Sequence, residues 1–199
     1  MKEKNLAVPE SYIVKSNEEV HALNAKLSEQ MEHSPDEDHY KYDFILKNIQ
    51  YDPVHRLDCF RLPTTKGKLQ KYLDKIADDG NAIDGKHPWT VQRFIDGEMW
   101  SGLHIQIDGK ICLSTCTKSK ASCFNWEHEE NDQIKQWSEK FSKEFPFNGI
   151  FTNDFIIDKH DGVAYAIECN PRLGSQVSLF HQVDNMADVI LGHNSDGVI

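Results

Sequence analysis

The sequence lacks both of the features that direct a chain to a membrane. No stretch approaches the roughly 20 consecutive apolar residues that a helix needs to cross a bilayer. The N-terminal residues MKEKNLAVPES contain no apolar core of signal-peptide length. We therefore expect a cytoplasmic protein with no membrane partner.

Runs of basic residues are also missing. The 199 residues include 32 acidic side chains against 22 Lys and Arg, which gives a formal net charge of −10. A chain with this excess of negative charge is repelled by a phosphate backbone unless its few basic residues are tightly clustered. Nucleic acid is therefore not an expected partner.

Cysteines and histidines do not occur at metal-binding spacings. The five cysteines form an odd set without a CxxC pair, and the ten histidines include no HxxxH or HExxH pattern. This usage favours neither a disulfide framework nor a zinc site, so we expect reduced thiols.

The sequence does contain enough apolar material for a core, with 39% hydrophobic residues over a length that suits one large domain or two small lobes. A β-prone segment at Ser11–Val14 precedes Ser16 and Glu19, whose S-x-x-E spacing predicts a capped helix through about Met31. The acidic segment 34–40 contains a proline and has no periodicity, which predicts a solvated loop.

The remaining elements follow from apolar periodicity, because spacings of three and four residues predict helices and alternation predicts strands. Predicted helices contain the stripe Leu69, Tyr72, Leu73, Ile76 and the segment 131–145; predicted strands cover 43–47, 89–95, 103–107, 111–113, 150–158 and 163–170. Asp108-Gly109 predicts a two-residue hairpin turn. Mainly antiparallel strands with packed helices predict an α+β fold.

The most informative segment is the hairpin predicted within residues 153–172, NDFIIDKHDGVAYAIECNPR. Strand side chains alternate, so Ala164, Ala166, Glu168 and Asn170 are expected on one face of its second strand. The small alanines on that face would leave room for a ligand beside the two oxygen-bearing side chains.

The turn of this hairpin predicts which residues face each other. A three-residue turn with Gly162 in the left-handed conformation places Lys159 opposite Val163. Counted onward from that pair, Asp154 lies directly opposite Glu168. Two carboxylates would then meet across the ladder.

Facing carboxylates destabilise a hairpin unless another charge compensates them. Asp154, Glu168 and Asn170 offer only oxygen ligands, and so small a set matches Mg²⁺, which keeps water ligands and takes phosphate oxygens from a nucleotide. Arg172 is placed to hold phosphate oxygens bidentately. From the residues alone, two alternatives stay open: solvent-facing charges on an ordinary hairpin, and a Ca²⁺-binding β module that uses the same carboxylates.

The run from Asp154 to Arg172 resembles the metal-binding hairpin of the ATP-grasp superfamily, in which an Asp-led strand and a glycine turn precede a strand ending in Glu-x-Asn-Pro-Arg. The resemblance covers nearly the whole chain. It implies ATP and Mg²⁺ as cofactors and the three oxygen-bearing residues named above as the metal ligands. It also implies a first lobe at residues 1–94 and a second lobe at residues 95–199, which clamp the nucleotide.

The resemblance implies roles for individual residues as well. FILK looks like the strand whose terminal lysine contacts nucleotide phosphates, so Lys47 and Arg172 are the implied catalytic residues. VQRFIDGE resembles the hinge between lobes, whose backbone holds adenine. The residues implied to bind ATP are Lys47, Gln92, Arg93, Phe94, Ile95, Glu98 and Lys118.

The sequence departs from the family pattern at two places. Glu98 directly follows Gly97, whereas the ribose-binding glutamate of the family comes one residue later, and a shift of one residue reverses the side that a strand residue faces. Either a bulge restores Glu98 to the ribose or that contact is missing. In place of the family's glycine-rich flap the chain has NIQYDPVHRLD, where His55 and Arg56, together with Lys118, are candidate phosphate donors.

The segments 46–58, 119–128 and 165–172 are similar to ATP-grasp ligases of the mycosporine-glycine synthase type. This likeness implies a ligase that phosphorylates a carboxylate or enolate acceptor, such as 4-deoxygadusol, and joins it to a small-molecule amine such as glycine. Carboxylate-amine ligases like carbamoyl-phosphate synthase share ENPR-like endings and are an alternative. A second alternative is an ATP- and metal-binding but catalytically incomplete module, since no α/β domain precedes the first strand. No residue pattern predicts the acceptor, the amine or the oligomeric state.

Overall fold

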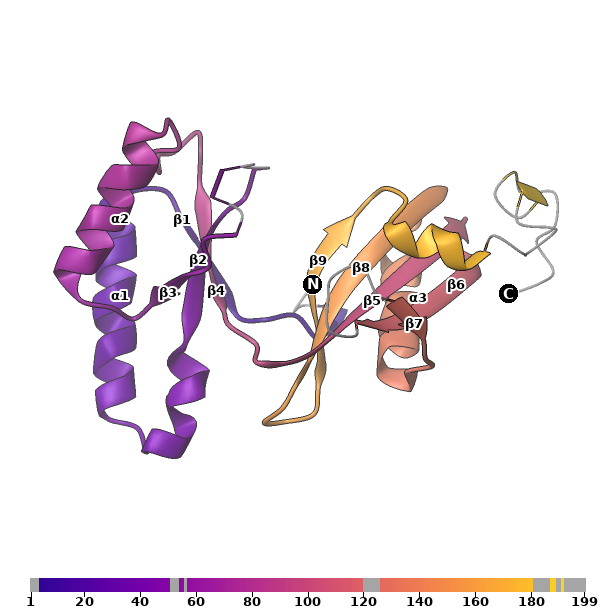
Figure 1. The fold of residues 1–199 in the computed structure, drawn as a ribbon, viewed down its shortest axis with the longest axis horizontal. Helices are drawn as coiled ribbons and strands as arrows, with labels where there is room; N and C mark the ends of the chain where they lie inside the picture. The colour runs from indigo at the N-terminus through magenta and orange to yellow at the C-terminus, as the bar shows by residue number, and fades with distance from the viewer. Residues whose placement is uncertain are drawn as a thin grey trace. The chain divides into compact units, whose positions relative to one another are not determined.

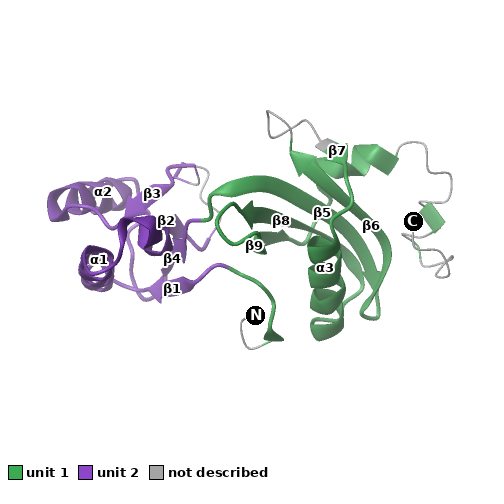
Figure 2. Ribbon diagram, turned by 90° about the horizontal axis from the view of Figure 1, so that it is seen from below, with its two compact units in different colours: residues 1–8, 95–199 green, residues 9–94 purple. Residues whose placement is uncertain are grey.

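The computed structural model describes residues 4–50, 54–55, 57–119, 126–180, 187–188 and 191. It confirms the predicted α+β class, with helices packed on two antiparallel sheets. The chain forms two compact units, one of residues 9–94 and the other of residues 1–8 and 95–199 (Figure 2). No helix among the described residues is long and apolar enough to cross a bilayer.

The unit of residues 9–94 is a four-stranded sheet with two long helices on one face (Figure 1). Its elements are β1 (Ser11–Val14), α1 (Asn17–Glu32), the 3₁₀ helix η2 (Asp36–Tyr42), β2 (Phe44–Asn48), β3 (Phe60–Leu62), α2 (Lys66–Asp78) and β4 (Trp89–Arg93), in the sheet order β1-β4-β2-β3. The predicted apolar stripe of α2 is buried and packs with Val20 and Leu27 of α1 and with Leu46 and Val91 of the sheet.

The start of α1 confirms the predicted capping box. The Ser16 hydroxyl oxygen accepts the Glu19 N–H at 3.3 Å, and the Glu19 carboxylate accepts the Lys15 N–H at 2.7 Å.

The acidic segment that follows α1 was predicted as a loop, and this was wrong. It forms η2, where the Asp38 N–H donates to the Pro35 carbonyl at 2.9 Å. None of the η2 residues is buried, so its solvent exposure was predicted correctly.

The other unit is built on a five-stranded antiparallel sheet in the order β7-β6-β5-β8-β9. Its elements are β5 (Gly97–Ile107), β6 (Lys110–Ser119), β7 (Trp126–His128), α3 (Asp132–Glu144), β8 (Gly149–Asp158), β9 (Ala164–Asn170) and the 3₁₀ helix η3 (Ser175–Phe180). The predicted two-residue turn is confirmed, because Ile107 pairs with Lys110 while Asp108 and Gly109 have φ angles of 49° and 77°.

The two faces of this sheet bury different residues. One face, here named the α3 face, packs against α3 through the cluster Trp100, Ile134, Trp137, Phe141, Phe151 and Phe155. The opposite face, here named the η3 face, buries Leu103, Ile105 and Leu113 with Phe180 of η3. Side chains alternate along each strand, so a residue next to one on the α3 face lies on the η3 face.

The first residues of the chain correct one predicted boundary. The first lobe was expected to begin at residue 1, yet residues 1–8 belong to the unit of residues 95–199. Leu6 is buried in the α3-face cluster, and the Ala7 carbonyl accepts hydrogen bonds from Trp137 Nε1 at 2.9 Å and from the Ala166 N–H at 3.2 Å. These long-range contacts have no local sequence signal. The other division between the two compact units falls between residues 94 and 95.

A buried histidine lies beneath α3. His104 is 1% exposed, its Nδ1 lies 2.9 Å from the Ser114 hydroxyl oxygen, and its Nε2 lies 3.0 Å from that of Ser138. Burial lowers the pKa of His104 to about 3, because the apolar surroundings disfavour the charged imidazolium. The folded chain therefore holds this imidazole neutral at physiological pH.

Acid should destabilise the wild-type chain more than a His104→Gln variant. The histidine pKa is about 6.5 in the unfolded chain and about 3 in the folded one, so its contribution is fully present above pH 6.5 and is lost as the pH falls toward 3. The stability gap between the two proteins should shrink by about 1.4 kcal/mol per pH unit in that window. Urea unfolding of both proteins between about pH 7 and pH 4 measures this gap. A constant gap contradicts the assignment of a neutral buried His104.

Candidate functional site

The hairpin of β8 and β9 brings the predicted metal ligands to one face. Asp154 pairs directly with Glu168, and Thr152 pairs with Asn170. Paired residues share a face, so Asp154, Glu168 and Asn170 all lie on the same side of the sheet. Ser101 is the β5 partner of Asp154, and its neighbour Trp100 lies on the α3 face. The predicted metal ligands therefore occupy the η3 face.

The facing of Asp154 and Glu168 was predicted correctly from a turn that was predicted wrongly. The expected pair of Lys159 with Val163 does not form; instead the Asp158 N–H donates to the Val163 carbonyl at 3.0 Å. The register then shifts between Asp154 and Phe155, which leaves Ile167 of β9 without a cross-strand partner in the ladder. This β-bulge offsets the change at the turn and returns Asp154 to its place opposite Glu168.

The bulge also reverses the expected face of the two alanines. Ala164 and Ala166 are 3% and 8% exposed and pack in the α3-face cluster. Glu168 is two residues further along, but the intervening bulge turns it to the η3 face. The expectation that the alanines leave room beside the metal ligands was therefore wrong, because it assumed uninterrupted alternation.

The electrostatics of this pair fit a cation. Burial raises the pKa of the Asp154 carboxyl and the nearby Glu168 carboxylate raises it further, while the Ser101 hydrogen bond and the charge of Arg172 act in the opposite direction. Glu168 is exposed. A desolvated carboxylate that faces a second carboxylate is stabilised by a positive ion.

The donor set of the pair fits Mg²⁺. Asp154, Glu168 and Asn170 present only oxygen atoms from side chains, the ligand type that Mg²⁺ prefers. Within the described ranges, no three His, Cys, Asp or Glu side chains gather into a group that could hold a metal. A cation with so few protein ligands takes the others from water or phosphate, as is usual for Mg²⁺ and not for Ca²⁺.

Arg172 lies just beyond the end of β9. Its backbone N–H donates to the Asn170 carbonyl at 2.8 Å, and its guanidinium Nη1 donates to the Leu173 carbonyl at 3.3 Å. The side chain is exposed, and its charge acts on the Asp154 carboxyl. The structure thus brings Arg172 together with the three predicted metal ligands.

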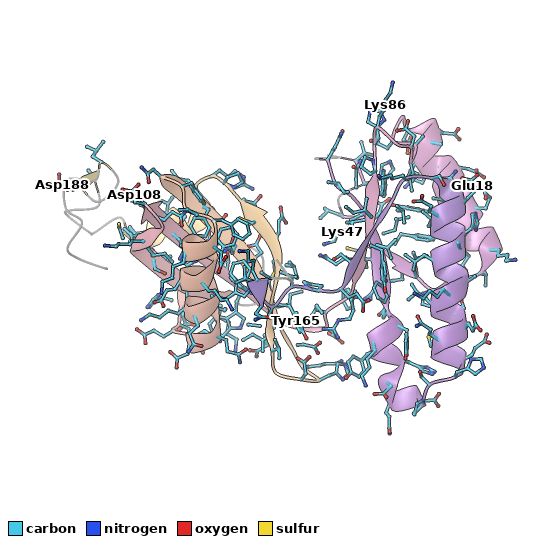
Figure 3. The ribbon with its side chains drawn as sticks, turned by 180° about the vertical axis from the view of Figure 1, so that it is seen from behind. Glu18, Lys47, Lys86, Asp108, Tyr165 and Asp188 are labelled. Atoms are coloured by element: carbon cyan, nitrogen blue, oxygen red, sulfur yellow. The ribbon has the colours of Figure 1, made fainter. Side chains whose placement is uncertain are left out.

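In the unit of residues 9–94, the structure brings Lys47 and Gln92 together. Lys47 Nζ donates to Gln92 Oε1 at 3.0 Å. Both side chains lie on the face of the sheet opposite the helices, because their neighbours Leu46 and Val91 are in the core with α1 and α2. Figure 3 shows Lys47 on the side of the sheet away from the helix that carries Glu18.

The segment predicted to hold adenine already uses two of its backbone donors. The Arg93 N–H donates to the Glu10 carbonyl at 2.7 Å and the Phe94 N–H to the Asp43 carbonyl at 2.8 Å. Ile95 is 2% exposed. Adenine binding by this segment stays a prediction. It would use backbone groups of the segment other than the N–H groups of Arg93 and Phe94.

Glu98 and Lys118 pair with each other on the other side of the sheet. Glu98 Oε2 lies 2.7 Å from Lys118 Nζ, and that ammonium lies 5.4 Å from the centre of the Trp100 ring. The hydrogen bond from Lys118 lowers the pKa of the Glu98 carboxyl. Both side chains are therefore on the α3 face, and the structure does not bring them together with Asp154.

The structure shows whether a β-bulge compensates for the position of Glu98 directly after Gly97. β5 pairs with β8 without a register shift from Gly97 to Gln106, so no bulge returns Glu98 to the η3 face. Met99, which is 40% exposed, takes the position beside Ser101 on that face.

His55, a candidate phosphate donor, is already engaged within its own unit. It is 5% exposed, with Nδ1 at 3.0 Å from Asp58 and Nε2 at 3.3 Å from Asp79. These contacts tie the segment after β2 to the end of α2, which indicates a structural role. The other candidate in this segment, Arg56, lies outside the described residues, as do parts of the segments 46–58 and 119–128.

Sequence reasoning missed two residues next to Asp154. Ser101 donates to Asp154 Oδ1 at 2.8 Å, and Gln176 of η3 donates to the Ser101 hydroxyl oxygen at 2.7 Å. Ser101 alternates with Leu103 and Ile105, so a polar residue at a core-facing position was the available signal. No sequence signal pointed to Gln176, because it and its partner Ser101 are 75 residues apart in the sequence.

Comparison with known proteins finds neither a matching family model nor a matching curated protein. Solved structures do match. The ATP-grasp ligase PsnB in complex with a precursor peptide and AMPPNP has a TM-score of 0.59 at 16% identity over 96% of this chain and 54% of PsnB. Phosphoribosylamine–glycine ligase from Thermotoga maritima has a TM-score of 0.65 at 17% identity, over 100% of this chain and 54% of that ligase. N5-carboxyaminoimidazole synthetase from Staphylococcus aureus has a TM-score of 0.62 at 14% identity, over 99% of this chain and 50% of that synthetase.

These similarities show that the chain has the ATP-grasp fold, as the sequence resemblance implied. The chain spans about half the length of the solved structures it matches. The similarity concerns the fold and leaves the mycosporine-glycine likeness as a prediction.

Proposed function

We propose that the chain is the ATP-binding part of an ATP- and Mg²⁺-dependent ligase that joins a phosphorylated acceptor to an amine. The observation that carries the proposal is the facing pair of Asp154 and Glu168, with Asn170 on the same face and Arg172 just beyond the strand end. Two opposed carboxylates without a cation would weaken the hairpin that holds them.

In the proposed reaction, a carboxylate or enolate oxygen of the acceptor attacks the γ-phosphorus of ATP. The bond between that phosphorus and the oxygen bridging to the β-phosphate breaks, and ADP leaves. The amine nitrogen then attacks the activated carbon, and phosphate leaves. Such transfers are accelerated chiefly by positioning and by charge stabilisation, with little covalent chemistry from the protein.

The chain offers side chains suited to these tasks. We assign the Arg172 guanidinium and the Lys47 ammonium to phosphate oxygens, where positive charge stabilises the transferring group. Asp154, Glu168 and Asn170 would hold Mg²⁺, which supplies further charge neutralisation at those oxygens when it is bound. One PsnB structure contains Mg and ADP, which supports both as ligands of this fold.

For the substrates, we propose the mycosporine-glycine type, in which a cyclohexenone enolate is the acceptor and glycine the amine. Support comes from the sequence likeness at segments 46–58, 119–128 and 165–172. A carboxylate acceptor, as in enzymes like carbamoyl-phosphate synthase, is the alternative within the same chemistry.

A second candidate function is an ATP- and metal-binding module without ligase activity. One observation favours it: Glu98 pairs with Lys118 on the α3 face, away from Asp154. Such a module would bind Mg²⁺-ATP and release no ADP.

The proposed activity is tested by ADP release in a coupled assay. The wild-type chain, with ATP, Mg²⁺, glycine and either a cyclohexenone enolate or a panel of carboxylates, should release ADP only when an acceptor is present. ADP release with the enolate but not with carboxylates supports the mycosporine-glycine type. Nucleotide binding without any acceptor-dependent ADP supports the inactive module instead.

A further inference from the structure

A buried hydrogen-bond chain reaches Asp154 from η3. Gln176 Nε2 donates to the Ser101 hydroxyl oxygen at 2.7 Å, and that hydroxyl donates to Asp154 Oδ1 at 2.8 Å. Ser101 is 0% exposed and Gln176 is 4% exposed. All three residues belong to the η3 face, and the chain of bonds ends on a predicted metal ligand.

The direction of these bonds follows from the number of hydrogens. Ser101 has one hydroxyl hydrogen and two acceptors within reach, Asp154 Oδ1 at 2.8 Å and the Asn153 carbonyl at 3.3 Å. A bond to a carboxylate is shorter and stronger than a bond to a neutral carbonyl. Because the amide N–H of Gln176 donates to the hydroxyl oxygen, the hydroxyl hydrogen points away from Gln176, and the charge and shorter distance of Asp154 Oδ1 direct it there.

The same segment of chain carries the other groups of the site. η3 begins three residues after Arg172, so Gln176 links this segment to β5 beside Asp154. Space for the amide depends on Gly174, where an added Cβ would lie 2.1 Å from Gln176 Oε1. Within the described residues that Oε1 has no hydrogen-bond partner. The bond from Nε2 to Ser101 is therefore the hydrogen bond of this buried amide that the structure shows.

We propose that Gln176 is a positioning residue for cation binding: it orients the Ser101 hydroxyl, which holds Oδ1 of Asp154 and leaves Oδ2 to face the cation. This inference rests on the proposed function, since it needs a divalent cation at Asp154 and Glu168. Partners that hold a metal ligand in place typically change metal affinity by about 10- to 100-fold when they are removed.

The test measures Mn²⁺ affinity by electron paramagnetic resonance on the full chain saturated with AMPPNP. Gln176→Met, which keeps the length and removes the donor, should weaken Mn²⁺ binding about tenfold. AMPPNP affinity measured in EDTA should stay within about twofold of wild type, since the chain of bonds acts on the metal ligand only.

A double-mutant cycle separates this role from general packing. Ser101→Ala should weaken Mn²⁺ binding about as much as Gln176→Met, and the double variant should be no weaker than Ser101→Ala alone, because both changes break one chain of bonds. The matched control is Thr117→Val, which removes the 3.0 Å bond from a buried hydroxyl to the Ser101 carbonyl. It should lower the melting temperature and leave Mn²⁺ affinity unchanged.

Failure of the positioning role and failure of the proposed function give different results in these measurements. Independent, multiplicative losses in the double variant, or wild-type Mn²⁺ affinity in Gln176→Met, overturn the positioning role alone. Absence of Mn²⁺ binding by the wild-type chain with AMPPNP overturns the proposed function and this inference with it. If Gln176→Met does not fold, Ser101→Ala carries the same test, because it breaks the same chain of bonds without adding a charge, and unchanged Mn²⁺ affinity in that variant overturns the positioning role.

Discussion

Glu168→Gln should reduce acceptor-dependent ADP release by about 100-fold or more, equivalent to about 2.7 kcal/mol of transition-state stabilisation. The amide keeps the shape of the side chain and removes one of the two negative charges that face each other at Asp154 and Glu168. A site with one carboxylate attracts a divalent cation much less strongly. The coupled ADP assay, run at several Mg²⁺ concentrations, measures the loss.

The same substitution has a second expected effect that separates metal binding from folding. Without a cation, the opposed carboxylates repel each other, so Glu168→Gln should leave the metal-free chain as stable as wild type or more stable by up to about 1 kcal/mol. Glu139→Gln, on the exposed side of α3, is the matched control and should change neither quantity. Wild-type turnover in Glu168→Gln would show that Glu168 does not hold a metal ion needed for the reaction.

Lys47→Met should lower ADP release by about 100-fold while the fold is retained. The Lys47 ammonium is bonded to Gln92 Oε1 at 3.0 Å on the face of the sheet away from the helices, where the family resemblance places the nucleotide phosphates. Methionine keeps most of the side-chain length and removes the charge, so the loss reports the electrostatic contribution to phosphoryl transfer. The affinity for Mg²⁺-AMPPNP, measured by calorimetry, should fall together with the rate.

Lys71→Met provides the control for Lys47→Met, because Lys71 is an exposed lysine of α2 in the same unit. It changes the net charge of the chain equally and should leave ADP release and nucleotide affinity unchanged. If both variants lose activity equally, the effect of Lys47→Met is one of overall charge, and the assignment of Lys47 to the phosphates is wrong.

Much of the fold could be predicted from local patterns. Leu69, Tyr72, Leu73 and Ile76 share one face of α2 and are all buried, because a 3.6-residue period leaves no other way to bury them together. The Asp108-Gly109 turn formed where expected, because both residues adopt positive φ in such turns. These features depend on neighbours in sequence, which a single sequence contains.

The features that were not predicted depend on long-range contacts or on small irregularities. The pairing of Asp154 with Glu168 was right only because a bulge at Ile167 offset a turn one residue longer than expected. The same bulge moved the alanines to the α3 face. A bulge changes the phase of alternation without changing composition, so the sequence gives no sign of it.

Glu98 and Gln176 show what could not be decided from the sequence at the site. The position of Glu98 directly after Gly97 left its contact with ribose open, and an uninterrupted β5 turns its side chain to Lys118 on the α3 face. Gln176 was not considered, and it is hydrogen-bonded to the residue that holds Asp154. Side-chain alternation along the continuous strand β5 sets the direction of Glu98. Packing of η3 onto β5 sets the contact of Gln176 with Ser101.

We propose above all that Asp154 and Glu168 bind a divalent cation together with ATP. Calorimetric titration of the wild-type chain with AMPPNP, in Mg²⁺ and again in EDTA, tests this most directly. We expect saturable binding in Mg²⁺ and at least about tenfold weaker binding in EDTA, a difference of about 1.4 kcal/mol. Equal affinity in the two conditions, or no binding in Mg²⁺, would contradict this proposal.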